Sequence, residues 1–592
     1  MQPRQPTRVA RGARKGPALT TTTTEGTEGT EGAGGPAPGR AGGRRADLAG
    51  AARGGALGLA GAGVAALGGF LLTAVVTRGL GPAGAGVFFE TFALFTILAA
   101  VGTAGADTAL LYAATRARAL GRVPELRRVL AVALGPALAA ALVLAAAVWL
   151  AAPVLSRLLV DPAHRDDGTG YLRLFAPFLV LAILGLIAVQ ATRGLGGLRT
   201  FVLLQQLALP LGRVALVALV LLLGLGGLAV PLAWAVPLLL VCPLALLALF
   251  RGLRRAESRH AAGEATGVNA AEAGGGSRAP RPLGAIAREF WGYAAGRGFA
   301  QAFTQSIVWF DVILVGALRS AHEAGVYAAA SRFVTTGTLV MQAMRLGTQP
   351  QIGAALAVGD TRRAETLYRA TTQWITASSW PLYLVLATFG PQVLRVFGGE
   401  FSEGADALSV LAVAMLFSLA TGNVNTVLLM AGKSRWNAAN TVVALAVNVG
   451  LNLLLVPDHG IIGAAWAWAA SILCERLMGL YEVRVLIGLR GHGRGFFLGA
   501  ALSALVFGAG GVAVRALAGS GPGAFAAYLA ASCAVYAAAL WAFRDALELP
   551  SLVDFVRARG GRAVRGGPVR VGTVPEPRPG PPPAGPGPGN GP

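Results

Sequence analysis

The chain has 592 residues, of which 54% are hydrophobic and only 13% are charged, and its formal net charge is +22. A soluble globular domain carries roughly 25% charged residues, so this composition excludes an ordinary soluble protein and indicates an integral membrane protein. The positive charge is spread along the chain and accompanies no recognition motif, so no nucleic acid is predicted as a partner.

The first 52 residues contain little that could form a hydrophobic core. They include the run Thr20–Thr24 and several Glu-Gly-Thr repeats, a composition typical of disordered segments. The first long apolar run starts too late and is too long for a cleavable signal peptide. We therefore expect residues 1–52 to form a disordered cytoplasmic tail.

Long apolar runs fill most of the remaining chain. A helix needs about 20 mostly apolar residues to cross about 30 Å of hydrocarbon. On that measure fourteen transmembrane helices are predicted, and they span Gly54–Thr77, Gly86–Tyr112, Val129–Leu150, Leu172–Thr192, Thr200–Gly224, Leu228–Phe250, Phe290–Leu318, Gly325–Gln349, Leu367–Gly390, Ala405–Met430, Trp436–Val456, Ile461–Ile487, Phe496–Leu517 and Ala524–Phe543. The seventh to ninth spans carry several polar residues each.

An internal repeat divides these helices into two sets of six. The segment Leu80–Phe88 has a counterpart, Leu318–Tyr327, about 239 residues later. Further matches follow in the same order, namely Pro153 with Pro391, Arg157 with Arg395, Arg199 with Arg435, Gly226 with Gly460 and Trp234 with Trp468. Repeats of hydrophobic helices are typical of transporters, whose substrate path lies between the two halves.

The predicted fold is therefore an all-α integral membrane protein of about 14 transmembrane helices, with two lobes and two extra C-terminal helices. The segments expected in chain order are a first six-helix lobe at residues 53–250, a cytoplasmic linker at 251–287, a second six-helix lobe at 288–487, two additional helices at 488–545 and a disordered Pro/Gly-rich tail at 546–592.

The short loops indicate the orientation. Arginine and lysine mark the cytoplasmic side of a membrane protein. With the N-terminus inside, the cytoplasmic loops hold most of these residues, as in Arg116–Arg128, Arg251–Arg281 and Lys433–Arg435, whereas the outside loops hold few basic residues and most of the acidic ones. We expect both termini to be cytoplasmic.

The cysteines and histidines do not indicate a metal site, a disulfide framework or a catalytic site. Cys242, Cys474 and Cys533 fall inside predicted spans and have no spacing typical of a metal site or a disulfide framework. All five histidines fall in loops. No catalytic group, metal or cofactor is predicted, and the chain is not expected to be an enzyme.

Several short segments recur at fixed places relative to the predicted helices. The first half carries Thr77–Pro82 and Gly86–Phe88 after the first helix. The second half carries the remaining ones, which are Asp311–Gly316, Ala324–Tyr327, Pro350, Gly359-Asp360 and Ala431–Lys433. In this order and placement the segments resemble the polysaccharide flippases of the multidrug/oligosaccharidyl-lipid/polysaccharide exporter superfamily. The resemblance covers roughly residues 53–487.

The resemblance implies a membrane transporter that moves undecaprenyl-diphosphate-linked oligosaccharide from the inner to the outer leaflet of a bacterial cell membrane for polysaccharide or cell-wall synthesis. It implies a lipid-linked sugar substrate, contact with membrane lipids, and polysaccharide polymerases and glycosyltransferases as further partners. The two additional helices resemble those of lipid II flippases. The first helix lacks the cationic cluster that those flippases usually place in their cavity, which favours another oligosaccharide over lipid II.

Polar side chains inside the spans are the candidate site. Arg297, Gln301 and Gln305 share one face of the seventh helix, and Gln342 and Arg345 share a face of the eighth. A charge at the bilayer centre is costly, so such residues face protein or water. We interpret them as the cationic wall of a cavity that binds diphosphate. Hydrogen bonding between helices is the alternative. Arg213 in the fifth helix is a further cavity candidate.

Asp311 and Arg332 lie on consecutive antiparallel helices at similar depth, so a pair between them is expected. A structural ion pair is favoured over a proton or cation site. Glu90 and Asp107 lie toward opposite ends of the second helix, where either side chain can reach the membrane interface.

Three other functions compete with the flippase. A cation-coupled drug exporter of the same superfamily would need buried acids, which the first and the fourth to sixth helices do not offer. A membrane glycosyltransferase or polymerase would need loop chemistry, for which Asp166-Asp167 is the single candidate. A scaffold protein without transport activity is the third alternative.

Overall fold

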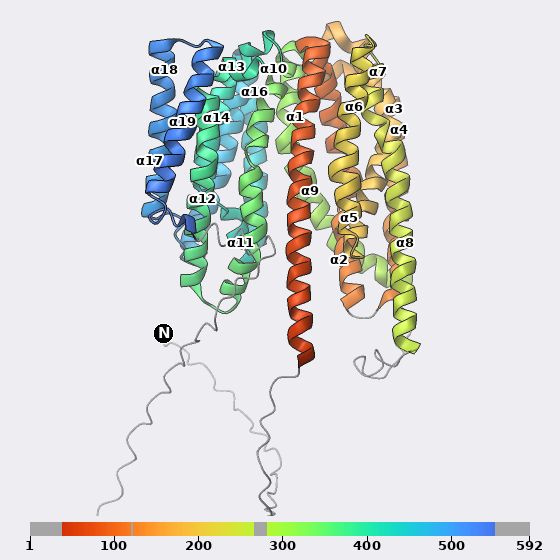
Figure 1. Ribbon diagram of the computed structural model, residues 1–592. Coiled ribbons are helices and arrows are strands. Elements are labelled where there is room, and N and C mark those ends of the chain that lie inside the picture. Colours follow the sequence, from red (N-terminus) through yellow and green to blue (C-terminus); the bar gives the residue numbers. More distant parts are fainter. Residues whose placement is uncertain (1–37, 120–121, 266–280, 551–592) are drawn as a thin grey trace, which may run out of the picture. The chain divides into compact units, whose positions relative to one another are not determined.

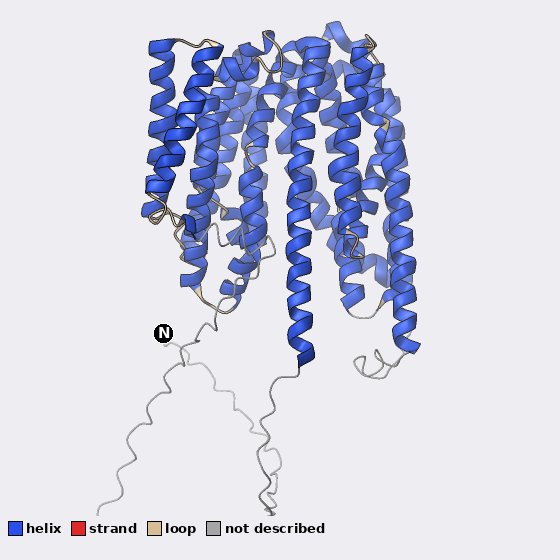
Figure 2. Ribbon diagram, viewed as in Figure 1, coloured by secondary structure: helices blue, strands red, loops and turns tan. Residues whose placement is uncertain are grey.

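The computed structural model describes residues 38–119, 122–265 and 281–550, and these are helical with short turns and no strand (Figures 1 and 2). Residues 52–592 form one compact unit, and residues 1–51 form a second one that is considered by itself. The predicted terminal tails fall mostly outside the described residues. The first helix nevertheless begins at Pro38, so residues 38–52 are helical where we expected disorder.

The first half of the chain contains the six expected spans. Its helices are α1 (Pro38–Thr103), α2 (Ala106–Ala119), α3 (Leu126–Leu159), α4 (Arg165–Gly194), α5 (Leu198–Phe201), α6 (Leu209–Leu222), α7 (Ala229–Ala235) and α8 (Pro237–Ala265), with short 3-10 turns at η1 (Val123–Glu125) and η2 (Pro162–His164) and a π-helical segment, η3 (Val202–Ala208), between α5 and α6. The expected linker thus starts inside a helix, because α8 continues beyond Arg251 to Ala265.

The second half repeats this arrangement and adds the two extra spans. Its helices are α9 (Leu283–Leu318), α10 (Ala321–Thr336), α11 (Leu339–Ala357), α12 (Thr361–Thr388), α13 (Gly390–Leu394), α14 (Ala405–Ala420), α15 (Val424–Met430) and α16 (Ser434–Glu482), followed by α17 (Arg494–Ser503), α18 (Gly510–Ala518) and α19 (Pro522–Ala542), with the one-turn segments η4 (Glu400–Gly404), η5 (Val483–Ile487) and η6 (Ala504–Ala509) between them.

Two of the long helices each contain two predicted spans. Helix α1 is interrupted at Gly81, whose φ and ψ are 66° and −178°, and α16 is interrupted at Gly460, at 55° and −137°. Only glycine adopts such positive φ values without strain. The chain reverses direction at these two residues, so the first and second spans, and the eleventh and twelfth, are antiparallel neighbours (Figure 1).

Ten helical stretches in the described part of the chain are long and apolar enough to cross a membrane, and they contain twelve of the fourteen predicted spans. The eighth and ninth predicted spans are helical, in α10–α11 and α12, but too polar to count among the ten. Their polarity has a structural reason, because several polar side chains of α12 are buried against other helices, namely Thr371, Thr372, Gln373, Thr376 and Ser379.

Helix α9 connects the two lobes. Within the first lobe α4 packs against α2, α3 and α8, and within the second α14 packs against α12 and α16. Helix α9 contacts α2 and α3 of the first lobe as well as α10 and α16 of the second. The additional helix α17 packs on α12. The predicted fold of two six-helix lobes with two further helices is confirmed.

Candidate functional site

The polar face of α9 is exposed in the structure. Arg297 and Gln301 are exposed, Gln305 is half-buried, and none of the three has a side-chain hydrogen bond to another described residue. The adjacent residue, Gly298, lies so close to the backbone of Ala104 in the first lobe that a side chain would not fit there. Arg297 is therefore next to a contact between the lobes.

The corresponding face of α11 is also exposed. Gln342 and Arg345 are both exposed, and Gln342 donates a hydrogen bond from Nε2 to Thr338 Oγ1 at 3.2 Å. No ion pair joins Arg345 to a carboxylate within the described residues. Both faces stay candidates for substrate binding.

Two arginines lie over tryptophan rings, one pair in each lobe. The Arg213 guanidinium of α6 is 3.7 Å from the ring centroid of Trp234 in α7, and the Arg332 guanidinium of α10 is 4.1 Å from that of Trp309 in α9. Phe92 packs edge-on against both tryptophans, with ring centroids 5.1 and 4.7 Å apart. The two cations are thus linked through one aromatic cluster that crosses between the lobes, and each gains a cation–π interaction there.

Asp311 has hydrogen-bond donors on two other helices. Its side chain is 2% exposed and accepts hydrogen bonds from the Tyr327 hydroxyl at 3.1 Å and from Asn452 Nδ2 at 2.8 Å. Arg332, which we expected to pair with Asp311, has its guanidinium over Trp309. Sequence reasoning missed Asn452, although Asn448 and Asn452 are a visible i, i+4 pair of amides in the eleventh predicted span.

Glu90 is the second buried acid. It is 2% exposed, and neither carboxylate oxygen has a hydrogen-bond partner among the residues that the structure describes. Its carboxylate lies against Gly316 of α9, where a side chain would collide with it. The Glu90 carboxylate is therefore buried between α1 and α9.

The repeated glycines face each other across the lobes. Gly86 lies against the backbone carbonyl of Ala321, and Gly325 lies against that of Pro82, in both cases too close for any side chain. Nearby, Arg78 Nε donates to the Val396 carbonyl at 2.8 Å. The interruption of α1 at Gly81 and the start of α10, both on the outer side as the charge pattern orients them, are thus in backbone contact at the two positions that the internal repeat relates.

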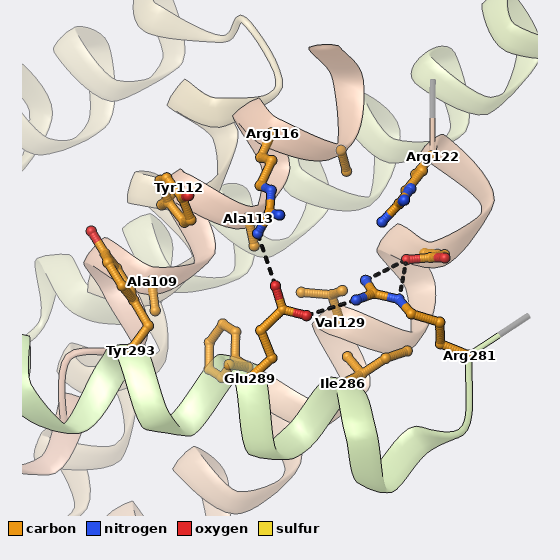
Figure 3. A pocket seen from close by; sticks show the side chains of 13 residues that line it. Ala109, Tyr112, Ala113, Arg116, Arg122, Val129, Arg281, Ile286, Glu289 and Tyr293 are labelled. Atoms are coloured by element: carbon orange, nitrogen blue, oxygen red, sulfur yellow. Dashed lines mark hydrogen bonds and ion pairs between the residues drawn. The ribbon is translucent and has the colours of Figure 1, made fainter. Parts of the chain in front are cut away.

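At the other end, ionic and aromatic contacts hold the start of α9 against the first lobe (Figure 3). Arg116 of α2 pairs with Glu289 of α9 at 2.8 Å, and Arg281 pairs with Glu289 at 2.6 Å and with Glu125 at 2.7 Å. The hydrogen bond to Glu125 raises the pKa of the Arg281 guanidinium, which therefore stays charged at physiological pH.

Two aromatic contacts accompany these ion pairs. The Tyr112 and Tyr293 rings stack with centroids 4.8 Å apart, and Trp291 Nε1 donates to the Val132 carbonyl at 3.2 Å. We call the ion pairs and these aromatic contacts together the inner latch.

Comparison with known proteins identifies the fold. Residues 298–454 match the MatE family model. Over 183 residues the chain is 22% identical to the "Probable low-salt glycan biosynthesis flippase Agl15" of Haloferax volcanii, an alignment that covers 31% of this chain and 39% of that protein's length.

Solved structures resemble nearly the whole helical region. The lipid II flippase MurJ in an inward closed conformation superposes with a TM-score of 0.53 at 10% identity, over 79% of this chain and 98% of that one. An inward-facing multidrug resistance MATE transporter of the MOP superfamily gives 0.52 at 16% identity, over 74% and 94%. A point mutant of the Vibrio cholerae MATE transporter VcmN gives 0.50 at 15%, over 76% and 99%. The chain therefore has the fold of these transporters, and residues 298–454 match the MatE family.

Several of the candidate residues lie within the MatE match. It begins one residue after Arg297, and it includes the rest of the α9 polar face, the α11 polar face, Asp311 and Arg332. Arg213, Glu90 and the ion pairs of the inner latch lie outside it.

Proposed function

We propose that this transporter flips undecaprenyl-diphosphate-linked oligosaccharide from the inner to the outer leaflet of a bacterial cell membrane by alternating access between its lobes. The partial similarity to a glycan flippase supports a lipid-linked glycan, and the MurJ-like fold is compatible with it. The observation that carries the proposal is the pair of exposed arginines Arg297, on the helix α9 that contacts both lobes, and Arg345, on α11. Arginine binds phosphate bidentately and keeps its charge when partly buried.

The direction of transport follows from the charge pattern. The loops rich in arginine share one end of the helices, and basic loops are cytoplasmic by the positive-inside rule. Each charge that crosses the membrane gains or loses about 2.3 kcal/mol per 100 mV, so two negative charges leaving a negative interior gain roughly 4 to 5 kcal/mol. The membrane potential therefore favours outward movement of a diphosphate.

A reconstituted flipping assay tests the proposal. Proteoliposomes with the full chain would receive a fluorescent undecaprenyl-diphosphate oligosaccharide, and a membrane-impermeant quencher would report which leaflet holds it. We expect exchange to equilibrate faster than in protein-free liposomes, and faster still with a potential that drives anions outward. No acceleration with lipid-linked oligosaccharides of several compositions would refute the proposal. The same assay with lipid II tests that alternative substrate.

Two buried acids favour a second candidate, a cation-coupled drug exporter. Glu90 lies between the lobes and Asp311 lies within the second lobe, whereas the sequence had suggested only that the first and the fourth to sixth helices offer no buried acid. An exporter of this kind should extrude a cationic dye only while a proton or sodium gradient is maintained. Dye efflux that stops when the gradient is dissipated, without lipid flipping, would support it over the flippase. We propose polymerases and glycosyltransferases as partners only for the flippase, and not for the drug exporter.

A further inference from the structure

The inner latch borders a pocket whose lining combines cations with an apolar floor (Figure 3). Arg116, Arg122 and Arg281 supply three guanidinium groups, against two carboxylates from Glu125 and Glu289. The remaining lining is mostly apolar or aromatic, and consists of Ala109, Tyr112, Ala113, Ala117, Val129, Ile286, Phe290 and Tyr293. The pocket thus has an uncompensated positive charge beside hydrophobic surface.

Hydrogen-bond donors remain free in this pocket. An arginine has five N–H groups. Arg281 uses three of them, on Glu125 and Glu289, and Arg116 uses one, on Glu289. The guanidinium of Arg122 has no hydrogen bond or ion pair to any described residue, and it points toward the same space (Figure 3). These free donors suit the several oxygens of a phosphate or diphosphate.

The position of the pocket along the helices indicates whether its ligand comes from the membrane or from solution. It lies at the end of the helices that carries the basic loops, where α2 ends and α9 begins. Tyr112 and Tyr293 are 47% and 42% exposed, and half-exposed tyrosines are typical of the membrane–water interface. A soluble anion would use the arginines alone, whereas an amphiphile would also cover the apolar floor.

We propose that this pocket is a loading site for a lipid-borne diphosphate at the inner leaflet, with Arg122, Arg116 and Arg281 on the diphosphate and the apolar floor against the first isoprene units. The inference rests on the proposed function for its substrate class and adds a site distinct from the α9 and α11 polar faces. Diphosphate oxygens would compete with Glu125 and Glu289 for their arginines, so that loading would loosen the inner latch.

Direct binding tests the loading site. The full chain in neutral phosphatidylcholine nanodiscs would be titrated calorimetrically with farnesyl diphosphate, and separately with inorganic diphosphate. We expect farnesyl diphosphate to bind at least tenfold more tightly than inorganic diphosphate. Arg122→Gln should weaken farnesyl diphosphate binding about tenfold, because a hydrogen bond to a charged group contributes about that factor or more. Arg122→Lys should recover part of the loss.

The matched control is Arg199→Gln, which removes the same charge from an exposed arginine at the same end of the helices but outside the pocket. It should leave binding unchanged. Arg122 is in no ion pair with a described residue, so its variants should also keep the thermal unfolding temperature of the parent chain.

Three results would overturn the inference. Equal weakening by Arg122→Gln and Arg199→Gln would show general electrostatic attraction. Equal affinity for inorganic and farnesyl diphosphate would show a site for free phosphate. Complete competition by phosphatidylglycerol added to the nanodisc at membrane-like content would show a site for bulk anionic lipid. Because binding is measured without transport, a chain that binds farnesyl diphosphate but flips nothing would reject the proposed function and keep the pocket.

Discussion

At the scale of single residues, the contacts of each arginine decide what else it can bind. Arg213 and Arg332 each have an aromatic ring against one face of the guanidinium. Arg297 and Arg345 are exposed and form no ion pair with a described carboxylate. An exposed guanidinium on a helix can turn toward a ligand without giving up an existing contact. The pair on α9 and α11 is therefore better suited to grip a moving diphosphate than the pair within the aromatic cluster.

Charge removal at this pair should abolish transport without harming the fold. We expect Arg297→Gln and Arg345→Gln each to reduce flipping to the protein-free rate in the liposome assay, with normal expression and membrane insertion. Lysine at either position should restore part of the rate, because it keeps the charge but not the bidentate geometry. Arg362→Gln, at an exposed arginine in the first turn of α12, is the matched control and should transport normally. Full transport by the Arg297→Gln, Arg345→Gln double variant would exclude this clamp.

Asp311 offers a test of two alternative partners. Asp311→Ala leaves the Tyr327 hydroxyl and one N–H of Asn452 without an acceptor, and we expect the free energy of unfolding to fall by roughly 2 kcal/mol or more, because each unsatisfied buried donor costs about 1–3 kcal/mol. A double-mutant cycle of Asp311→Ala with Tyr327→Phe should give a coupling of about 1 kcal/mol, as for one hydrogen bond. The same cycle with Arg332→Gln should give less. A larger coupling to Arg332 than to Tyr327, measured by unfolding in detergent, would support the ion pair that the sequence suggested.

At the scale of the helices, the glycine contact between α1 and α10 should be intolerant of any side chain. Gly86→Ala and Gly325→Ala each place a methyl group against a backbone carbonyl of the other lobe, and overpacking of this kind typically costs about 1–3 kcal/mol. We expect both variants to lose the closed outer end and to slow transport severalfold. Gly69→Ala, on α1 with open space around it, is the control and should behave like the parent chain. Unchanged transport in both contact variants would mean that this end need not close.

The lengths of the apolar runs in the sequence predicted the helices, but they could not predict the breaks within those helices. Runs of about 20 apolar residues mark where a helix can cross the bilayer, since backbone groups in lipid must bond within the segment. The breaks between α1 and α2, between α10 and α11, and between α14 and α15 divide spans that we predicted as continuous. Hydropathy describes side chains and not φ and ψ. A glycine such as Gly105 or Gly422, each with positive φ, was the available signal.

The sequence indicated the candidate residues by their type and spacing, but it could not indicate which residues they contact. Helical periodicity grouped Arg297 with Gln301 and Gln342 with Arg345 on shared faces, and all four residues are exposed in the structure. It could not show that Arg332 would meet Trp309, because a face of a helix has no fixed neighbour until the helices pack. The pocket beside Arg122 combines residues from α2 and η1 with residues from α9, far along the chain, so only the fold brings them together.

At the scale of the whole molecule, the two lobes are in contact at both ends of the helices. The glycines of α1 and α10 meet at one end, and the inner latch joins α9 to α2 and α3 at the other. Alternating access requires one of these contacts to open while the other holds. The first is a packed backbone contact, whereas the inner latch consists of aromatic contacts and of partly exposed ion pairs, which are individually weak, and the backbone contact of Gly298 with Ala104 lies outside the latch. The inner latch is therefore the contact that a ligand can release more easily.

Cysteine labelling can measure the orientation of the protein in the membrane, that is, which end of the helices is cytoplasmic. In a variant without Cys242, Cys474 and Cys533, single cysteines would replace Asp166, Gly399 or Arg435, all of them exposed. Asp166 and Gly399 lie at the end with few basic residues, and Arg435 lies at the end with many, so the positive-inside rule puts only the first two outside. In intact cells an impermeant maleimide should label the Asp166→Cys and Gly399→Cys chains, and should label Arg435→Cys only after the membrane is permeabilised. The opposite pattern would invert the orientation, and with it the assignment of the inner latch to the cytoplasmic side. Labelling of all three in intact cells would contradict the span count between them.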